Sequence, residues 1–340
     1  MITRLPERPD IQIFRPNAEM PVVEHPFAHD PGYGYSLSGL LAITPPEPPQ
    51  GFVEYWQNRI QHVATIDPDI KFLTPPTIEN DFQIQEIEFT SSQNQRVFAW
   101  VVSPADQNVQ NLGVVGHGYG GRTGPDAPSS LPHTACIYPC ARGLGRTHTA
   151  ELIDSTSASH VVFGLESRET YIHGFCVDDY CAAANVLLHL YPEAASRLYY
   201  SGGSFGGGIG ALLIPWDKRF KVAYFRDPSF GHYPIRVKVP CTGSGQHISA
   251  IYEKNAEVLN VLKWFDAATA ARFITTPTLV AASLLDPSVP PPGQFAVYNA
   301  IPAGHKELCI KTAGHFVVDS SPDEVAAIEE YLTQFLQKHL

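Results

Sequence analysis

One serine in a glycine-rich turn has the surroundings that nucleophilic chemistry requires. Ser204 lies at the centre of the sequence GGSFG (202–206), which follows a short apolar segment at 198–201 and precedes a predicted helix. In a strand-to-helix turn of this kind the serine hydroxyl is held toward solvent, and Gly202 and Gly206 avoid collisions with the neighbouring elements. The pattern predicts a nucleophile elbow. A glycine-rich turn without a catalytic role is the alternative.

A serine hydroxyl needs a general base beside it, and that base needs a carboxylate to orient it. Asp286 follows an apolar segment of strand length, 277–285, and precedes a proline-rich turn. His315 follows the last predicted strand, 307–311. Serine, acid and histidine therefore occur in the order found in α/β-hydrolases, each after a strand. The order predicts a catalytic triad of Ser204, Asp286 and His315.

Each partner of the serine has an alternative interpretation. Asp227, which follows the apolar segment 220–225, is the rival acid, because some hydrolases carry the acid one strand earlier. Asp286 could instead cap the turn before Pro287, and His315 could be a packed loop histidine. Exchanging each aspartate for asparagine would separate the two acids.

The oxyanion formed during acyl transfer needs two hydrogen-bond donors already in position. The backbone N–H of Phe205, directly after the serine, is expected to be one of them. The second is expected from the loop HGYGG (117–121), where the N–H of Tyr119 is the predicted donor. A glycine-rich turn without a catalytic part is again the alternative. No Gly-Lys-Ser/Thr sequence follows, so a phosphate-binding loop is not indicated.

Predicted strands and helices alternate along most of the chain and would position these residues. Residues 51–66 have the spacing of an amphipathic helix, and 82–90 and 95–102 form a predicted antiparallel hairpin. Further strands or helices are expected at 113–116, 134–139, 175–189, 198–201, 220–225, 277–282, 307–311 and 322–340. This alternation predicts an α/β fold with a mostly parallel sheet flanked by helices.

The predicted domain organisation is simple. Residues 1–50 are rich in proline and glycine, which is typical of an extended arm, and 51–340 are expected to form a single domain. The polar, irregular stretch 146–170 predicts a long loop of the kind found near functional sites.

Composition excludes several classes of function. The 340 residues carry a net charge of −11, which argues against nucleic acid and anionic membranes as partners. No segment approaches the ~20 apolar residues of a membrane span, and the N-terminal residues lack a signal sequence, so a cytoplasmic location is expected. The six cysteines make no CxxC pair and the 14 histidines are dispersed. Reduced thiols and no bound metal are therefore expected.

From about residue 51 to 336 the chain resembles the acetyl xylan esterase and cephalosporin C deacetylase family, carbohydrate esterase family 7. The motifs that carry the resemblance are GYGGRTG, ARGLG, GGSFGGG, LLDPSVPPPGQFAVYNAI and AGHF. The resemblance implies an α/β-hydrolase fold without a large lid, the triad and oxyanion donors given above, and no metal or cofactor. It also implies a homo-oligomer, commonly a hexamer in the family. Arg142 matches the family arginine that holds the loops beneath the active site.

Three residues depart from the family pattern. Leu144, Phe205 and Phe316 each stand where the family has a polar residue. These replacements predict a more hydrophobic pocket and make sugar acetates less secure as substrates. The predicted function is a serine esterase that deacetylates acetylated oligosaccharides or small molecules through an acyl-enzyme. A general esterase, lipase or peptidase of the same fold is one alternative, and a catalytically silent binding or scaffold protein is another.

Overall fold

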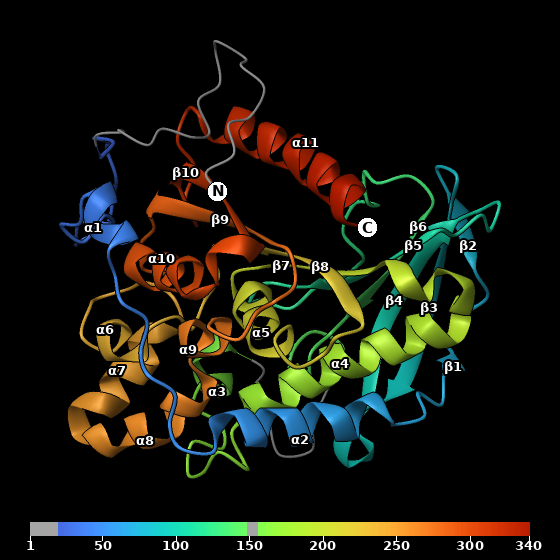
Figure 1. Cartoon of the computed structure of the whole chain (residues 1–340), viewed down its shortest axis with the longest axis horizontal. Coiled ribbons are helices and arrows are strands. Elements are labelled where there is room, and N and C mark those ends of the chain that lie inside the picture. Colours follow the sequence, from blue (N-terminus) through green and yellow to red (C-terminus); the bar gives the residue numbers. More distant parts are fainter. Residues whose placement is uncertain (1–19, 148–155) are drawn as a thin grey trace.

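The structure is a computed structural model that describes residues 20–147 and 156–340. The strands of this part of the chain form one ten-stranded sheet, and helices cover both of its faces (Figure 1). Most of the strands run parallel, which confirms the predicted α/β fold. Residues 1–19, part of the predicted arm, lie outside the described residues.

The strands are β1 (Lys71–Phe72), β2 (Thr77–Glu79), β3 (Phe82–Thr90), β4 (Arg96–Pro104), β5 (Asn111–Gly116), β6 (Thr134–Pro139), β7 (Leu198–Gly203), β8 (Phe220–Arg226), β9 (Thr278–Leu285) and β10 (Lys306–Ala313). The helices are α1 (Leu37–Leu41), α2 (Phe52–Ala64), α3 (Ser157–His160), α4 (Ile172–Leu190), α5 (Phe205–Leu213), α6 (Tyr233–Arg236), α7 (Gly245–Lys254), α8 (Leu259–Leu262), α9 (Ala267–Ala271), α10 (Pro291–Ala300) and α11 (Ser321–His339).

The sheet has the order β1-β3-β4-β6-β5-β7-β8-β9-β10, with β2 paired to β3. The predicted hairpin is confirmed, because β3 and β4 pair antiparallel over their whole length. From β5 through β10 every neighbouring pair in the order β5-β7-β8-β9-β10 is parallel. The carboxyl ends of these strands therefore meet at one edge of the sheet.

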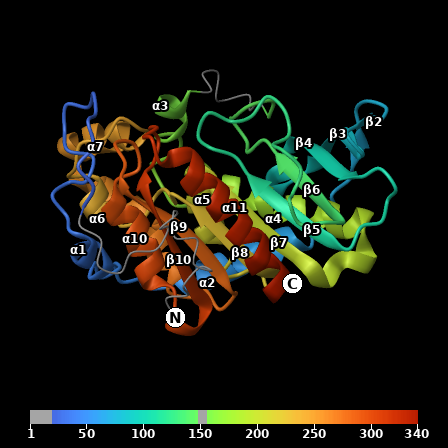
Figure 2. The same ribbon diagram turned by 90° about the horizontal axis from the view of Figure 1, so that it is seen from above.

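Residues along the central strands alternate between two hydrophobic cores, one on each face of the sheet. In β4, Val97 and Ala99 join the core beneath α2, α4 and α5, whereas Phe98 and Trp100 join the core beneath α11. This alternation follows from the two-residue period of a strand. Figure 2 shows α11 crossing the strands on the face opposite α2 and α4.

The sequence missed the short elements. Helix α1 has five residues and β1 has two, which is too little for a periodic pattern to be recognised. The segment between β8 and β9 is divided into α6, α7, α8 and α9, and none of these helices exceeds ten residues. Within the stretch predicted as a long loop, residues 148–155 lie outside the described residues and α3 occupies Ser157–His160.

Residues 20–50 have little regular structure apart from α1, and they pack against the body of the protein. The side-chain amide of Asn299 in α10 donates to the carbonyl oxygens of Leu40 and Ile43 at 2.9 and 3.0 Å. The boundary predicted at residue 50 between an arm and a single domain stays a prediction.

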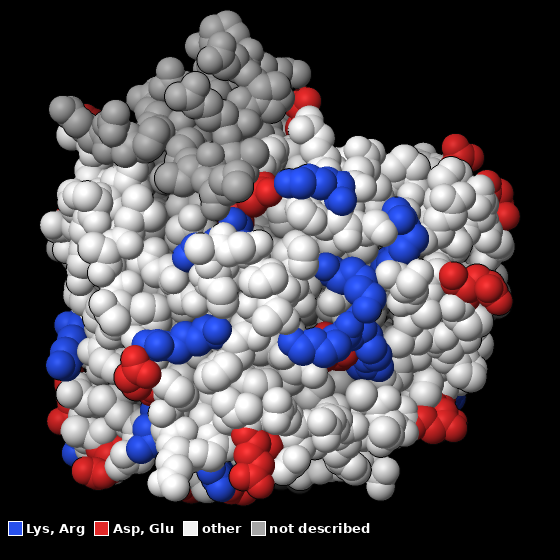
Figure 3. Space-filling view, in the orientation of Figure 1, with Lys and Arg blue, Asp and Glu red and all other residues white. Residues whose placement is uncertain are grey.

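No helix in the described residues is both long and apolar enough to cross a membrane. Among residues 20–147 and 156–340, no group of three or more His, Cys, Asp or Glu side chains is arranged to hold a metal ion. All six cysteines are buried and free. On the face drawn in Figure 3, acidic and basic side chains are interspersed with broad uncharged areas.

Candidate active site

Four side chains that the sequence analysis singled out follow four neighbouring parallel strands. Three of them directly follow the last residue of a strand: Ser204 follows β7, Asp227 follows β8 and Asp286 follows β9. His315 lies two residues beyond the end of β10. Because parallel neighbours end at the same edge, this edge is where α/β sheets place their ligand sites.

Ser204 occupies a strained turn between β7 and α5. Its φ of 53° and ψ of −114° lie in a region that L-residues rarely adopt. A Cβ added to Gly202 would lie 2.6 Å from the carbonyl carbon of Gly206, and one added to Gly206 would lie 2.7 Å from that of Gly116. Neither position can hold a side chain, which is the geometry predicted for a nucleophile elbow.

The structure brings the three predicted triad residues into one hydrogen-bonded line. His315 Nε2 lies 2.9 Å from Ser204 Oγ, and His315 Nδ1 lies 2.7 Å from Asp286 Oδ2. A neutral imidazole can satisfy both contacts if Nδ1–H donates to the carboxylate and the serine hydroxyl donates to Nε2. Ser204 and His315 are accessible, whereas Asp286 is fully buried.

Asp286 is oriented by donors that the sequence analysis did not identify. The backbone N–H groups of Ser288 and Val289 donate to Oδ1, each at 2.9 Å. The side-chain amide of Gln294 in α10 donates to Oδ2 at 2.9 Å, and Gln294 is fully buried. Gln294 and Asn299 are the two amides of the mostly apolar α10, and a polar residue within such a helix is the sequence signal that could have indicated Gln294. These bonds fix the carboxylate plane toward His315.

Burial lowers the pKa of His315, but the hydrogen bond and the charge of Asp286 raise it by more, so the pKa lies above its ordinary value. The charge of Asp227 raises this pKa further, and that of Lys311 lowers it. The imidazole thus retains a proton at a higher pH than a free histidine does.

Asp227, the rival acid, does not contact His315. Its carboxylate accepts from Lys311 Nζ at 2.6 Å and from the hydroxyl of Ser283 at 2.5 Å. The strand register explains this position, because the last residue of β8 pairs with Ala281, well before β9 ends. Asp227 therefore lies level with the middle of β9, whereas Asp286 lies beyond the end of that strand.

The two predicted oxyanion donors lie on adjoining segments of the chain. Phe205 is the first residue of α5, and Tyr119 follows β5. The N–H of Gly206 donates to the carbonyl oxygen of His117 at 2.9 Å, which ties the elbow to the loop after β5. Neither the N–H of Phe205 nor that of Tyr119 donates to another residue in the described part of the chain.

The side chain of Phe205 packs beneath the site and does not line it. It is fully buried, with its ring centroid 5.6 Å from that of His117 and 4.7 Å from that of Tyr119. Leu144 is also buried in the core. The expectation that these two replacements make the pocket more hydrophobic is therefore wrong. Of the three departures, Phe316 alone is partly exposed.

Two histidines far from the loop in sequence fix the side chain of Tyr119. Its hydroxyl lies 2.9 Å from His160 Nδ1 and 3.1 Å from His173 Nε2. His160 Nε2 lies 3.0 Å from the carbonyl oxygen of Arg142 and must donate to it. His160 Nδ1 is then an acceptor, so the tyrosine hydroxyl donates to it and accepts from His173. No sequence pattern connects these residues.

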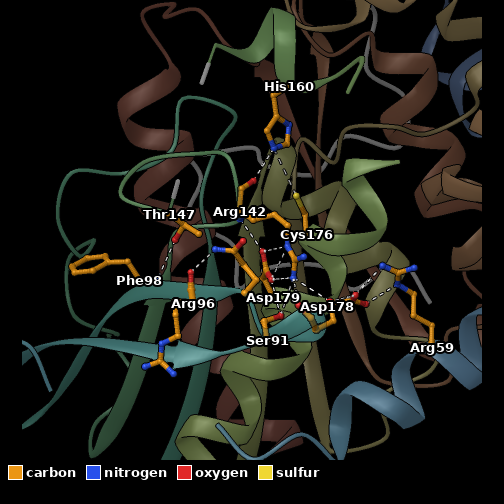
Figure 4. A network of polar contacts seen from close by, with 12 residues as sticks. Arg59, Ser91, Arg96, Phe98, Arg142, Thr147, His160, Cys176, Asp178 and Asp179 are labelled. Atoms are coloured by element: carbon orange, nitrogen blue, oxygen red, sulfur yellow. Dashed lines mark hydrogen bonds and ion pairs between the residues drawn. The ribbon is translucent and has the colours of Figure 1, made fainter. Parts of the chain in front are cut away.

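Arg142 anchors the loop after β6 in a buried network (Figure 4). Its guanidinium lies 2.6 Å from Asp179 of α4, and its backbone N–H donates to the same carboxylate at 2.8 Å. Ser91 also donates to Asp179, while Asp178 pairs with Arg59 of α2 at 2.7 Å. Arg142 thus joins the loop after β6 to α4, and its role in holding the loops beneath the active site stays a prediction.

The buried histidines predict sensitivity to acid. Burial lowers the pKa of His117 to about 3 and that of His160 to about 4, and it lowers that of His173 well below the ordinary value. These histidines bind protons near pH 6 only when the chain is unfolded. The free energy of unfolding should therefore fall as the pH decreases below about 6.5, by up to ~1.4 kcal/mol per pH unit for each histidine.

Urea unfolding between about pH 5 and pH 8 measures this dependence. The variant His160→Gln has one buried histidine fewer and is the matched control. Below pH 6.5 its free energy of unfolding should change less steeply with pH than that of the parent protein. Equal slopes for the two proteins would contradict the assignment of His160 as neutral in the folded state.

A mostly parallel sheet that carries a serine on a strand-to-helix turn, followed by an acid and a histidine after later strands, defines the α/β-hydrolase fold. The family model described as acetyl xylan esterase (AXE1) matches residues 43–334. The chain belongs to this family, and it is a serine carboxylic-ester hydrolase.

Solved structures of similar fold include two acetyl xylan esterases. The enzyme from Paenibacillus sp. R4 has a TM-score of 0.75 and 21% identity, covering 90% of this chain and 100% of its own. Acetyl xylan esterase 1 from Thermoanaerobacterium sp. JW/SL YS485 has a TM-score of 0.75 and 20% identity, covering 89% and 98%. The acylaminoacyl peptidase of Pyrococcus horikoshii has a TM-score of 0.60 and 15% identity, covering 77% and 42%. A search of curated protein sequences finds no match.

Proposed function

We propose that Ser204, His315 and Asp286 hydrolyse acetyl esters through an acyl-enzyme. The observation that carries the proposal is the hydrogen-bonded line from Ser204 Oγ through the imidazole to Asp286. Ser204 Oγ attacks the ester carbonyl while His315 Nε2 accepts the hydroxyl proton. The N–H groups of Tyr119 and Phe205 stabilise the resulting oxyanion.

The remaining steps use the same groups in the opposite direction. The imidazolium donates its proton to the leaving alcohol as the bond from the carbonyl carbon to the alcohol oxygen breaks. Water then attacks the carbonyl carbon of the acyl-enzyme while His315 again accepts a proton. The bond to Ser204 Oγ breaks, the imidazolium returns the proton to that oxygen, and acetate leaves. Asp286 keeps the imidazole in the tautomer that presents an unprotonated Nε2.

The proposed substrates are acetylated small molecules or oligosaccharides, which the family membership supports. The sequence also supports the proposals of a cytoplasmic location and of a homo-oligomer, which the family resemblance implies to be a hexamer. Light scattering coupled to size-exclusion chromatography measures the oligomer directly.

Two measurements test this function. A fluorophosphonate probe should label the protein at Ser204, and p-nitrophenyl acetate should be hydrolysed faster than the corresponding butyrate and ferulate esters. A protein that is not labelled and hydrolyses no ester would be the silent binding protein considered above. Labelling combined with a preference for longer acyl chains or for peptides would instead indicate a general esterase, lipase or peptidase.

A further inference from the structure

A segment that precedes the residues matched by the family model contacts the proposed active site. Residues 25–33 precede the matched range 43–334, yet the carbonyl oxygen of Pro31 accepts the backbone N–H of Asp286 at 2.9 Å. A Cβ added to Gly32 would lie 3.1 Å from the side chain of Leu285, so the segment packs tightly against the end of β9.

Internal hydrogen bonds hold this segment in one conformation. The carboxylate of Asp30 accepts the N–H groups of Gly32 and Gly34, each at 2.8 Å. The hydroxyl of Tyr33 donates to the carbonyl oxygen of Pro240 at 2.8 Å, which fastens the segment to the loop before α7. Residues 30–34 are thereby fixed beside Asp286.

Apolar side chains continue from His315 onto this segment. Phe316 follows His315 directly, and Phe27 packs edge-on against it, with ring centroids 5.2 Å apart and an interplanar angle of 79°. His25 stacks on Phe27 at 5.6 Å, and Val317 is 83% exposed. Phe27 and Phe316 are each half-buried, so part of each ring stays open to solvent next to His315.

Reaction chemistry decides which part of the ester faces this surface. The leaving alcohol receives its proton from His315 Nε2, so the alcohol must be bound on the histidine side of Ser204. We infer that Phe27 and Phe316 form a wall that contacts the alcohol portion of the substrate and favours apolar or aromatic alcohols over sugars. This inference rests on the proposed function and narrows its substrate class.

Two acetates with alcohols of similar acidity test the wall. The ratio of kcat/KM for benzyl acetate to that for 2-methoxyethyl acetate should fall about five- to tenfold in Phe27→Ala, because an aromatic contact is lost. The preference between p-nitrophenyl acetate and p-nitrophenyl butyrate, which differ on the acyl side, should stay unchanged. Phe316→Glu should lower the benzyl ratio in the same direction, and it tests the wall independently if Phe27→Ala folds poorly.

Phe72→Ala is the matched control, because Phe72 is a 56% exposed phenylalanine on β1, at the opposite edge of the sheet from β10. It should leave both ratios unchanged. If the parent protein hydrolyses neither acetate, the proposed function itself fails. If the parent protein hydrolyses both acetates while neither Phe27→Ala nor Phe316→Glu changes the benzyl ratio, the proposed function stands and the proposed wall is wrong. This holds even if a variant lowers kcat/KM for both acetates by the same factor.

Discussion

Ser204→Ala is expected to remove nearly all ester hydrolysis, lowering kcat by at least about 10⁴-fold. The reason is that the hydroxyl 2.9 Å from His315 Nε2 is the group proposed to attack the carbonyl, and alanine offers no nucleophile. Alanine fits the same space, and the surrounding glycines keep the turn open. Turnover of p-nitrophenyl acetate by the purified variant measures the effect.

A thermal unfolding curve of Ser204→Ala is the control, since the variant should unfold at or slightly above the temperature of the parent. The same variant should not react with a fluorophosphonate. Retention of most of the parent activity by a folded Ser204→Ala protein would show that another group performs the hydrolysis.

Asp286→Asn should lower kcat by about 10⁴-fold, the loss known when the acid of a serine triad becomes an amide. An asparagine amide that donates to Nδ1 would select the tautomer with a proton on Nε2, which cannot act as the base. The substitution also removes the interactions that raise the pKa of His315. The acid limb of the residual activity should therefore shift to lower pH, which a pH–rate profile measures.

Asp227→Asn is the matched comparison and should lower kcat less than tenfold. It leaves the ammonium of Lys311 buried without a negative partner, at a cost of about 3–5 kcal/mol in the free energy of unfolding. The double variant Asp227→Asn/Lys311→Met removes both charges and keeps the comparison valid if the single variant unfolds. A large loss of activity in Asp227→Asn with most of the activity retained in Asp286→Asn would identify Asp227 as the acid instead.

The sequence could predict the residues whose position follows from chain order alone. Ser204, Asp286 and His315 each follow a strand, and parallel strands bring their carboxyl ends together. The choice between Asp227 and Asp286 depends on how far each strand extends past its neighbour. That register is set by pairing across the sheet, so the sequence left both acids open.

Contacts between distant segments could not be predicted. The clamp on Tyr119 needs His160 and His173, which come from α3 and from α4 and carry no common motif. Burial of Phe205 could not be anticipated either, because the direction of a side chain at the first turn of α5 depends on what packs there. The composition of residues 20–35 indicated only an extended arm. In the structure, the carbonyl oxygen of Pro31 accepts a hydrogen bond from the backbone N–H of Asp286, the proposed catalytic acid.

The bond between Pro31 and Asp286 has a consequence for how the chain folds. It joins one of the first described residues to one synthesised much later, so the early segment must wait for β9 before it can dock. Closing so long a loop is entropically costly and is repaid only when the rest of the sheet is in place. We expect ester hydrolysis to appear late during refolding, after most of the secondary structure has formed.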